Sequence, residues 1–197
     1  MSYRPDPSMS VFEAILARRS VRAYGPQALE RATIQTLLEA VVRAPTAMHE
    51  EPWAFAVVQD KQVLEKLSDR AKPIFVEEAR RRQAQSGGHS FEIFSRPDFN
   101  IFYDAGTLIV ICAKPLGPFV SADCWLGAEN LMLAACSMGL GTCVIGSALT
   151  ALNIPEVKTQ LGIAAEFSAV APIIVGVPQG ATAATSRRDP RILSWKS

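Results

Sequence analysis

The sequence has almost no net charge and few of the residues that commonly bind metals. In 197 residues, 20 Lys and Arg stand against 19 Asp and Glu, which gives a formal net charge of +1. Binding to nucleic acid would need a strongly segregated basic face, so we expect no such partner. There are only two His and four Cys, and no Cys-x-x-Cys pair occurs. This composition predicts no metal site, and it favours reduced, mostly buried thiols in an intracellular protein.

The sequence also lacks an apolar run long enough to cross a membrane. Its longest apolar stretches, residues 105–113 and 167–177, fall short of the roughly 20 residues that a membrane-spanning helix needs. The opening MSYRPDPSMS carries prolines and charge where a secretory signal would be apolar. We therefore expect a cytoplasmic protein with no membrane partner. Because 49% of the residues are hydrophobic, we expect the chain to bury a sizeable core.

Motifs of familiar hydrolases and nucleotide-binding proteins are absent. GLGTCVIG has glycines at 139, 141 and 146, which is not the G-x-G-x-x-G spacing, and it follows a predicted helix instead of a strand. No G-x-S-x-G elbow, Walker lysine loop or H-E-x-x-H is present. We therefore predict no catalytic side chain acting as nucleophile or general base.

The hydrophobic pattern predicts alternating helices and strands in one α+β domain, residues 1–197. Ser10 and Glu13 have capping-box spacing and should open a helix over 11–19. Gly139 should end a central helix, apolar nearly all round, over 121–138. Pro73 should separate two short helices, 61–71 and 73–85. The remaining predicted helices are 34–42 and 154–162, and the predicted strands are 53–60, 105–113, 141–146 and 167–178.

Two stretches have no regular hydrophobic period. Residues 86–100 include Gly87-Gly88, and we interpret them as a mobile surface segment, with a lid as one option. The tail from 179 to 197 is aperiodic as well, yet Ile192, Leu193 and Trp195 need burial. We therefore expect the tail to pack on something else, such as a partner subunit.

Three polar segments stand out in this apolar sequence: RRSVR at 18–22, RAPTAMHEEPW at 43–53 and TSRRDP at 185–190. Arginine forks beside a serine hydroxyl can bind a phosphate or ribityl oxygens. The same arginines also suit the C-terminal end of a helix, whose dipole favours positive charge, or a solvated surface. The residues alone leave these alternatives open.

Four segments, in this order, resemble the nitroreductase family of FMN-dependent oxidoreductases. They are ILARRSVRAYGP, RAPTAMHEEPWAFAVVQD, GAENLMLAACSMGLGTCVIG and VGVP, and together they span almost the whole chain. The resemblance implies an α+β fold with a mixed sheet flanked by helices. It also implies a homodimer formed through long helices, a C-terminal extension that wraps the partner subunit, and FMN at the subunit interface.

The resemblance also implies a set of cofactor-binding residues. The FMN phosphate, ribityl chain and pyrimidine edge would be contacted by Arg18, Arg19, Ser20 and Arg22. The loop from the partner subunit would contribute Pro45, Thr46, Ala47 and His49, with Arg43 as a further candidate. The strand facing the flavin ring would contribute Val144, Ile145 and Gly146. Arg187 would bind the phosphate, with Arg188 in its place if the register slips by one. Asp123 is either a polar flavin contact or an acidic residue favoured near a helix N-terminus.

The loop at Pro45 departs from the family pattern. Thr46, His49 and Glu51 replace the serine, asparagine and glutamine that the family has there. His49 either touches flavin or substrate or caps the loop, and Glu51 is expected to accept hydrogen bonds at the Pro52 turn. These changes affect the expected substrate class more than flavin binding, because the arginine cluster is intact.

The activity implied by the resemblance is hydride transfer from NAD(P)H, as co-substrate, through FMN to an acceptor. The acceptor would be a nitroaromatic, a quinone or a similar conjugated molecule. One alternative is the same fold with a different redox reaction, such as dehalogenation, dehydrogenation or flavin breakdown. Another is a flavin-binding protein that does not turn over.

Overall fold

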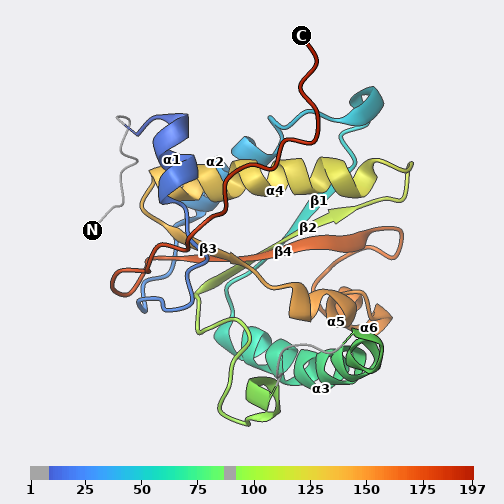
Figure 1. Ribbon diagram of the computed structural model, residues 1–197. Helices are drawn as coiled ribbons and strands as arrows, with labels where there is room; N and C mark the ends of the chain where they lie inside the picture. The colour runs from blue at the N-terminus through green and yellow to red at the C-terminus, as the bar shows by residue number, and fades with distance from the viewer. Residues whose placement is uncertain (1–8, 87–91) are drawn as a thin grey trace.

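The computed structural model describes residues 9–86 and 92–197, which form a sheet between two helical layers (Figure 1). Strand β1 (Trp53–Val58) pairs with β2 (Thr107–Ala113), β2 pairs with β4 (Ser168–Gly176), and β4 pairs with β3 (Gly141–Val144). Each of these pairs is antiparallel, and a parallel pairing appears as an isolated bridge between Ser20 and Thr142. The predicted α+β fold with helices on both faces of a sheet is confirmed.

Helices cover both faces of the sheet. One face carries α1 (Val11–Ala17), α2 (Arg31–Val41) and α4 (Val120–Ser137), and the other carries α3 (Lys61–Ser86), α5 (Leu149–Leu152) and α6 (Pro155–Gln160) (Figure 1). Short 3-10 turns are η1 (Ala47–His49), η2 (Glu92–Ser95) and η3 (Gly146–Ala148). No described helix is both long enough and apolar enough to span a bilayer.

Strand β2 builds both hydrophobic cores, because successive side chains on a strand point to opposite faces. Leu108 and Val110 pack into the core with α3, whereas Ile109 and Ile111 pack into the core with α2 and α4. Every residue of β2 is buried. The predicted continuous burial of residues 105–113 on both faces is therefore confirmed over the strand itself.

The ends of two predicted helices differ from the structure. The capping box of Ser10 and Glu13 opens α1 as predicted, but the helix ends at Ala17 and Arg18 is extended, with φ −55° and ψ 133°. Backbone pairing of the following residues with β3 takes over from helix geometry there. The predicted break at Pro73 is wrong, because α3 continues through it. A buried apolar face runs past the proline, from Leu64 to Ala79, and stabilises the longer helix.

Part of the predicted surface segment 86–100 lies outside the described residues, which leave out 87–91. Within it, Phe94 packs on Phe75 and Phe99, with ring centroids 4.5 and 5.3 Å apart. In the tail, Ile192, Leu193 and Trp195 are 63%, 84% and 81% exposed. Their expected burial does not occur against their own chain.

Candidate functional site

The arginine segment 18–22 lies along the edge of the sheet, beside β3. The Val21 N–H donates to the Thr142 carbonyl at 2.9 Å, and the Gly25 N–H donates to the Val177 carbonyl at 2.9 Å. Because Val21 and Tyr24 are buried, the extended backbone presents Ser20 and Arg22 on the exposed side. Four of the predicted residues therefore belong to one anchored segment, in which Ser20 and Arg22 are exposed and Arg18 and Arg19 are half-buried.

Two glycines allow this segment to lie so close to the sheet. A Cβ added to Gly141 would lie 2.7 Å from a Val21 methyl carbon, and one added to Gly176 would lie 2.8 Å from Cδ1 of Tyr24. The packing role of Gly141 was not predicted from the sequence. The segments GLGT and VGVP could have indicated it, since each places a glycine at the end of a strand that faces the arginine segment.

The first two arginines have different partners. Arg18 lies near Glu129 of α4, with Nε 3.6 Å from Oε1. Arg19 donates from Nη1 to the carbonyls of Leu16 and Arg18, so it caps the end of α1. Arg19 therefore matches the alternative in which an arginine binds backbone carbonyls at the C-terminal end of a helix.

Arg22 forms a cluster with Tyr103, Tyr24 and Cys143 at the β3 edge of the sheet. Its guanidinium carbon is 5.9 Å from the centroid of the Tyr103 ring. Burial raises the pKa of the Cys143 thiol, although nearby Arg22 and Ser20 act in the opposite direction. Burial likewise raises the pKa of Tyr24 above its ordinary value, and the Tyr24 hydroxyl donates to the Val21 carbonyl at 2.8 Å. The exposed Arg22 therefore lies beside a half-buried aromatic ring, a buried tyrosine and a buried thiol.

The second group of predicted residues forms the loop at Pro45. Asp123, only 4% exposed, accepts the backbone N–H of Ala47 at 3.3 Å to each carboxylate oxygen. Met48, His49 and Glu51 have positive φ values of 56°, 55° and 42°. Strained backbone of this kind persists only where the surroundings hold it in place, and it is common at binding sites. Thr46, Ala47 and His49 thus lie in a constrained loop, with Pro45 and Arg43 exposed just before it.

The end of β3 supplies the third group. Val144 pairs with Ile173, and the Ile145 N–H donates to the Pro172 carbonyl at 2.9 Å. Gly146 is exposed, and an added Cβ there would meet no atom within 4 Å. The chain therefore presents open backbone at Gly146, directly after a strand that is fixed in the sheet.

Arg187 lies in the exposed tail, where its Nη1 donates to the Ser186 carbonyl at 3.4 Å. Among the contacts of the described residues, none joins Arg187 to the segment 18–22. The single chain does not bring these predicted residues together.

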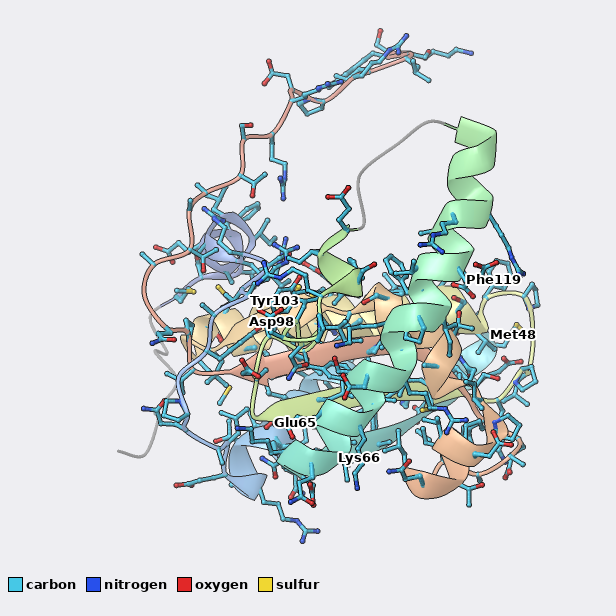
Figure 2. The ribbon with its side chains drawn as sticks, turned by 90° about the horizontal axis from the view of Figure 1, so that it is seen from below. Met48, Glu65, Lys66, Asp98, Tyr103 and Phe119 are labelled. Atoms are coloured by element: carbon cyan, nitrogen blue, oxygen red, sulfur yellow. The ribbon has the colours of Figure 1, made fainter. Side chains whose placement is uncertain are left out.

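The arginine segment and the Pro45 loop also lie apart along α4. Asp123 holds the loop near the start of this helix. Arg18 and Arg19 lie near the other end, where their charges oppose the rise that burial causes in the pKa of Cys136. At a rise of 1.5 Å per residue, Asp123 and Cys136 are separated by about 20 Å. Figure 2 likewise shows Met48 of the loop at one side of the molecule and Tyr103, the neighbour of Arg22, well away from it, nearer the middle. Within one chain, the two groups of predicted residues therefore lie apart.

The layered fold defines an α+β protein with a partly exposed cationic segment anchored at the edge of its sheet. The sequence model of the Nitroreductase family matches residues 15–177, and the chain belongs to this family. Among the described residues, no cluster of three metal-ligating side chains occurs.

Individual relatives are consistent with this family. A Methanothermobacter thermautotrophicus protein named NADH dehydrogenase/NAD(P)H nitroreductase is 29% identical over 137 residues, which cover 68% of this chain but only 59% of that protein. A nitroreductase from Bacteroides fragilis, crystallised with bound FMN, is 29% identical with a TM-score of 0.79, covering 95% of this chain and 98% of that one. An iodotyrosine deiodinase bound to FMN and 3-iodo-L-tyrosine shares the fold, with a TM-score of 0.70 at 20% identity, covering 93% of this chain and 97% of that one.

Proposed function

We propose that this chain is a cytoplasmic FMN-dependent oxidoreductase that uses NAD(P)H to reduce a nitroaromatic, a quinone or a similar conjugated acceptor. The observation that carries the proposal is the arginine segment, fixed to the sheet edge at Val21 and Gly25 by backbone hydrogen bonds. When bound, FMN supplies the redox chemistry, accepting hydride from the nicotinamide and passing the electrons to the acceptor.

The donor set fits the chemical groups of FMN. Arg22 is exposed and would offer a planar, permanently charged fork to oxygens of the cofactor, and Ser20 would offer a hydroxyl to ribityl oxygens. Arg18 and Arg19 would join them with the N–H groups that their contacts with Glu129 and the end of α1 leave over. The exposed backbone at Gly146, where an added Cβ would meet no atom within 4 Å, would face the ring.

The chain's own residues would bind and orient the cofactor instead of taking part in covalent steps. Arg22 would stabilise negative charge near the pyrimidine edge, where a cation favours the reduced cofactor. Asp123 would keep the Pro45 loop in place, and His49 would project from that loop toward cofactor or acceptor. No general base is required from the protein.

A homodimer would unite these two groups of predicted residues, with the Pro45 loop of one subunit meeting the arginine segment of the other. The exposed face of α1 supports this proposal, since Val11, Phe12, Ile15 and Leu16 are each more than half exposed. Trp125 and Leu126 of α4 are 40% and 48% exposed. Apolar surface on neighbouring helices is typical of a protein interface.

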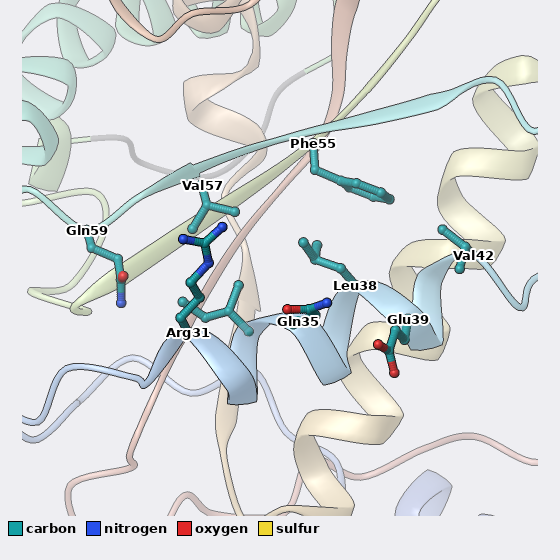
Figure 3. A pocket seen from close by; sticks show the side chains of 9 residues that line it. Arg31, Gln35, Leu38, Glu39, Val42, Phe55, Val57 and Gln59 are labelled. Atoms are coloured by element: carbon teal, nitrogen blue, oxygen red, sulfur yellow. The ribbon is translucent and has the colours of Figure 1, made fainter.

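The tail would wrap the partner subunit, bringing Arg187 to the partner's cofactor. An apolar groove of about 670 Å³ between α2 and β1, lined by Leu38, Phe55 and Val57, offers a place for Ile192, Leu193 and Trp195 (Figure 3). Strand β1 is an edge of the sheet, and edge strands of native proteins are commonly covered. None of the expected cofactor residues lines this groove, so it is a better candidate for protein than for FMN.

The absorption spectrum of the purified protein tests the proposal. We expect a visible flavin band, either as isolated or after adding FMN, which NADH or NADPH bleaches under anaerobic conditions. A panel of nitroaromatics, quinones and halogenated aromatics should then restore the band, and the fastest acceptor defines the substrate class. A colourless protein that gains no flavin band would overturn the proposal, and a bound flavin that neither nicotinamide reduces would favour a non-catalytic flavin-binding protein.

A further inference from the structure

The ring of Tyr103 is an aromatic partner of the Arg22 guanidinium. The guanidinium carbon lies over the ring, 5.9 Å from its centroid, within the range of cation–π attraction. Arg22 itself is on the exposed side of its segment. We propose that Tyr103 is a positioning residue, which holds Arg22 in the orientation that meets the flavin. This inference rests on the proposed function, because it concerns the same site.

The backbone at Tyr103 is strained in a way that aims its side chain. Tyr103 and Asp104 have φ values of 51° and 56°, in the left-handed region that non-glycine residues rarely adopt. Two adjacent residues of this kind need strong bracing from their surroundings. A backbone with negative φ at Tyr103 would point the ring in another direction. The left-handed conformation therefore determines that the ring faces Arg22.

Asn100 supplies much of the bracing. Its side-chain oxygen accepts the Phe102 N–H at 2.9 Å, its amide donates to Oδ1 of Asp104 at 3.0 Å, and its carbonyl accepts the Tyr103 N–H at 2.9 Å. The Ile101 N–H also donates to the Ser68 hydroxyl of α3 at 3.1 Å. The turn is therefore tied both to itself and to the helical layer.

Aromatic packing fixes the ring from the other direction. The Tyr103 ring meets Phe99 nearly at right angles, with centroids 5.6 Å apart, and Phe99 meets Phe94 in the same manner at 5.3 Å. Edge-to-face pairs of this kind favour a defined ring orientation. Phe94 in turn contacts Phe75 of α3, so a row of rings connects Arg22 to that helix.

This arrangement suits the binding of an oxygen ligand. Attraction of the Arg22 guanidinium to the Tyr103 ring, 5.9 Å away, uses the positive charge and leaves N–H groups available as donors. A long exposed arginine otherwise loses rotamer freedom when it binds a ligand, and an arginine already held in place loses less. Tyr103 should therefore raise the affinity for FMN without having to contact it.

The test compares FMN dissociation constants of Tyr103→Leu and Tyr103→Phe with that of the full-length wild type. Both substitutions keep a non-glycine residue at the strained position, but only Phe keeps the ring. We expect Tyr103→Leu to weaken FMN binding about five- to tenfold and Tyr103→Phe to change it less than about twofold. The flavin reduction potential of Tyr103→Leu should fall, because Arg22 is then less well placed to stabilise the reduced form.

A double-mutant cycle with Arg22→Ala separates positioning from general structural damage. In the Arg22→Ala background, Tyr103→Leu should have no further effect on FMN binding. Phe167→Leu, which removes a ring outside this row that lies 5.0 Å from Nζ of Lys114, serves as the matched control and should bind FMN as tightly as Tyr103→Phe. Wild-type affinity in Tyr103→Leu, or an equal loss in both backgrounds, would overturn the inference alone. A wild type that binds no FMN would overturn the proposed function with it.

Discussion

At the scale of single residues, a buried carboxylate connects the central helix to a strained loop. Asp123 is 4% exposed, and its two oxygens accept the N–H of Ala47, 76 residues earlier in the chain. The neighbouring Met48 and His49 have left-handed backbones. A charged acceptor stabilises a buried N–H more strongly than a neutral one does. Asp123 therefore sets the shape of the loop that we expect to meet the cofactor.

We predict that Asp123→Ala weakens FMN binding about three- to tenfold, because the loop must then be ordered when the ligand binds. The free energy of unfolding should fall by about 1 kcal/mol as well, since the Ala47 N–H loses its acceptor. Fluorescence titration with FMN and urea denaturation measure the two effects.

Asp60→Ala is the matched control for this prediction. Asp60 also accepts backbone N–H groups, from Gln62 at 2.8 Å and Val63 at 3.1 Å, but it does so at the start of α3. Its loss should cost about 1 kcal/mol of stability and leave FMN binding unchanged. If both variants affect FMN binding equally, Asp123 has no special role in the loop.

At the scale of elements, glycines decide how close the arginine segment comes to the sheet. Val21 packs against Gly141 at the start of β3, and Tyr24 packs against Gly176 at the end of β4. Any side chain at these two positions would push the segment outward. The orientation of Ser20 and Arg22 thus depends on residues more than one hundred positions further along the chain.

We predict that Gly141→Ala weakens FMN binding and lowers the free energy of unfolding by about 1–3 kcal/mol, because its Cβ would overlap the side chain of Val21. Gly117→Ala is the control, since the nearest atom to an added Cβ there is Oε2 of Glu50 at 3.8 Å. That substitution should change stability by less than about 0.5 kcal/mol. Flavin-free and flavin-bound melting curves compare the two, and equal stability of both variants would contradict the packing argument.

At the scale of the whole molecule, one chain leaves apolar surface and an apolar tail uncovered. Exposed apolar residues on α1, on α4 and near the C-terminus, where Trp195 is 81% exposed, form part of this surface. Both views show the end of the tail projecting away from the rest of the chain (Figures 1 and 2). A second copy of the chain could cover these surfaces and complete the site at once.

We predict that removing residues 181–197 weakens the dimer and releases FMN, because the tail would no longer cover the partner subunit. Arg187→Ala in the full-length chain should stay dimeric and lose about tenfold in FMN affinity, the value of one charge-assisted contact. Analytical ultracentrifugation and FMN titration distinguish the two effects. A truncated protein with unchanged dimer stability and unchanged FMN affinity would contradict the wrapping of the tail.

Much of the architecture could be predicted because its determinants are local. The capping box at Ser10 and the left-handed Gly139, with φ of 62°, mark helix ends through neighbouring residues alone. Pro73 shows the limit of such rules, since packing against the sheet overrides a local helix breaker. The assignment of individual residues to cofactor binding and the single-domain organisation stay predictions.

The alternation of helices and strands, the family and the list of expected site residues could be read from the sequence, since periodicity and motifs are properties of nearby residues. The contacts between residues far apart in the chain came from the folded structure. It joined Val21 to Thr142, Asp123 to Ala47 and Arg22 to Tyr103. Such contacts depend on how close the elements pack and on where strained turns aim their side chains, and neither is encoded in the spacing along the chain.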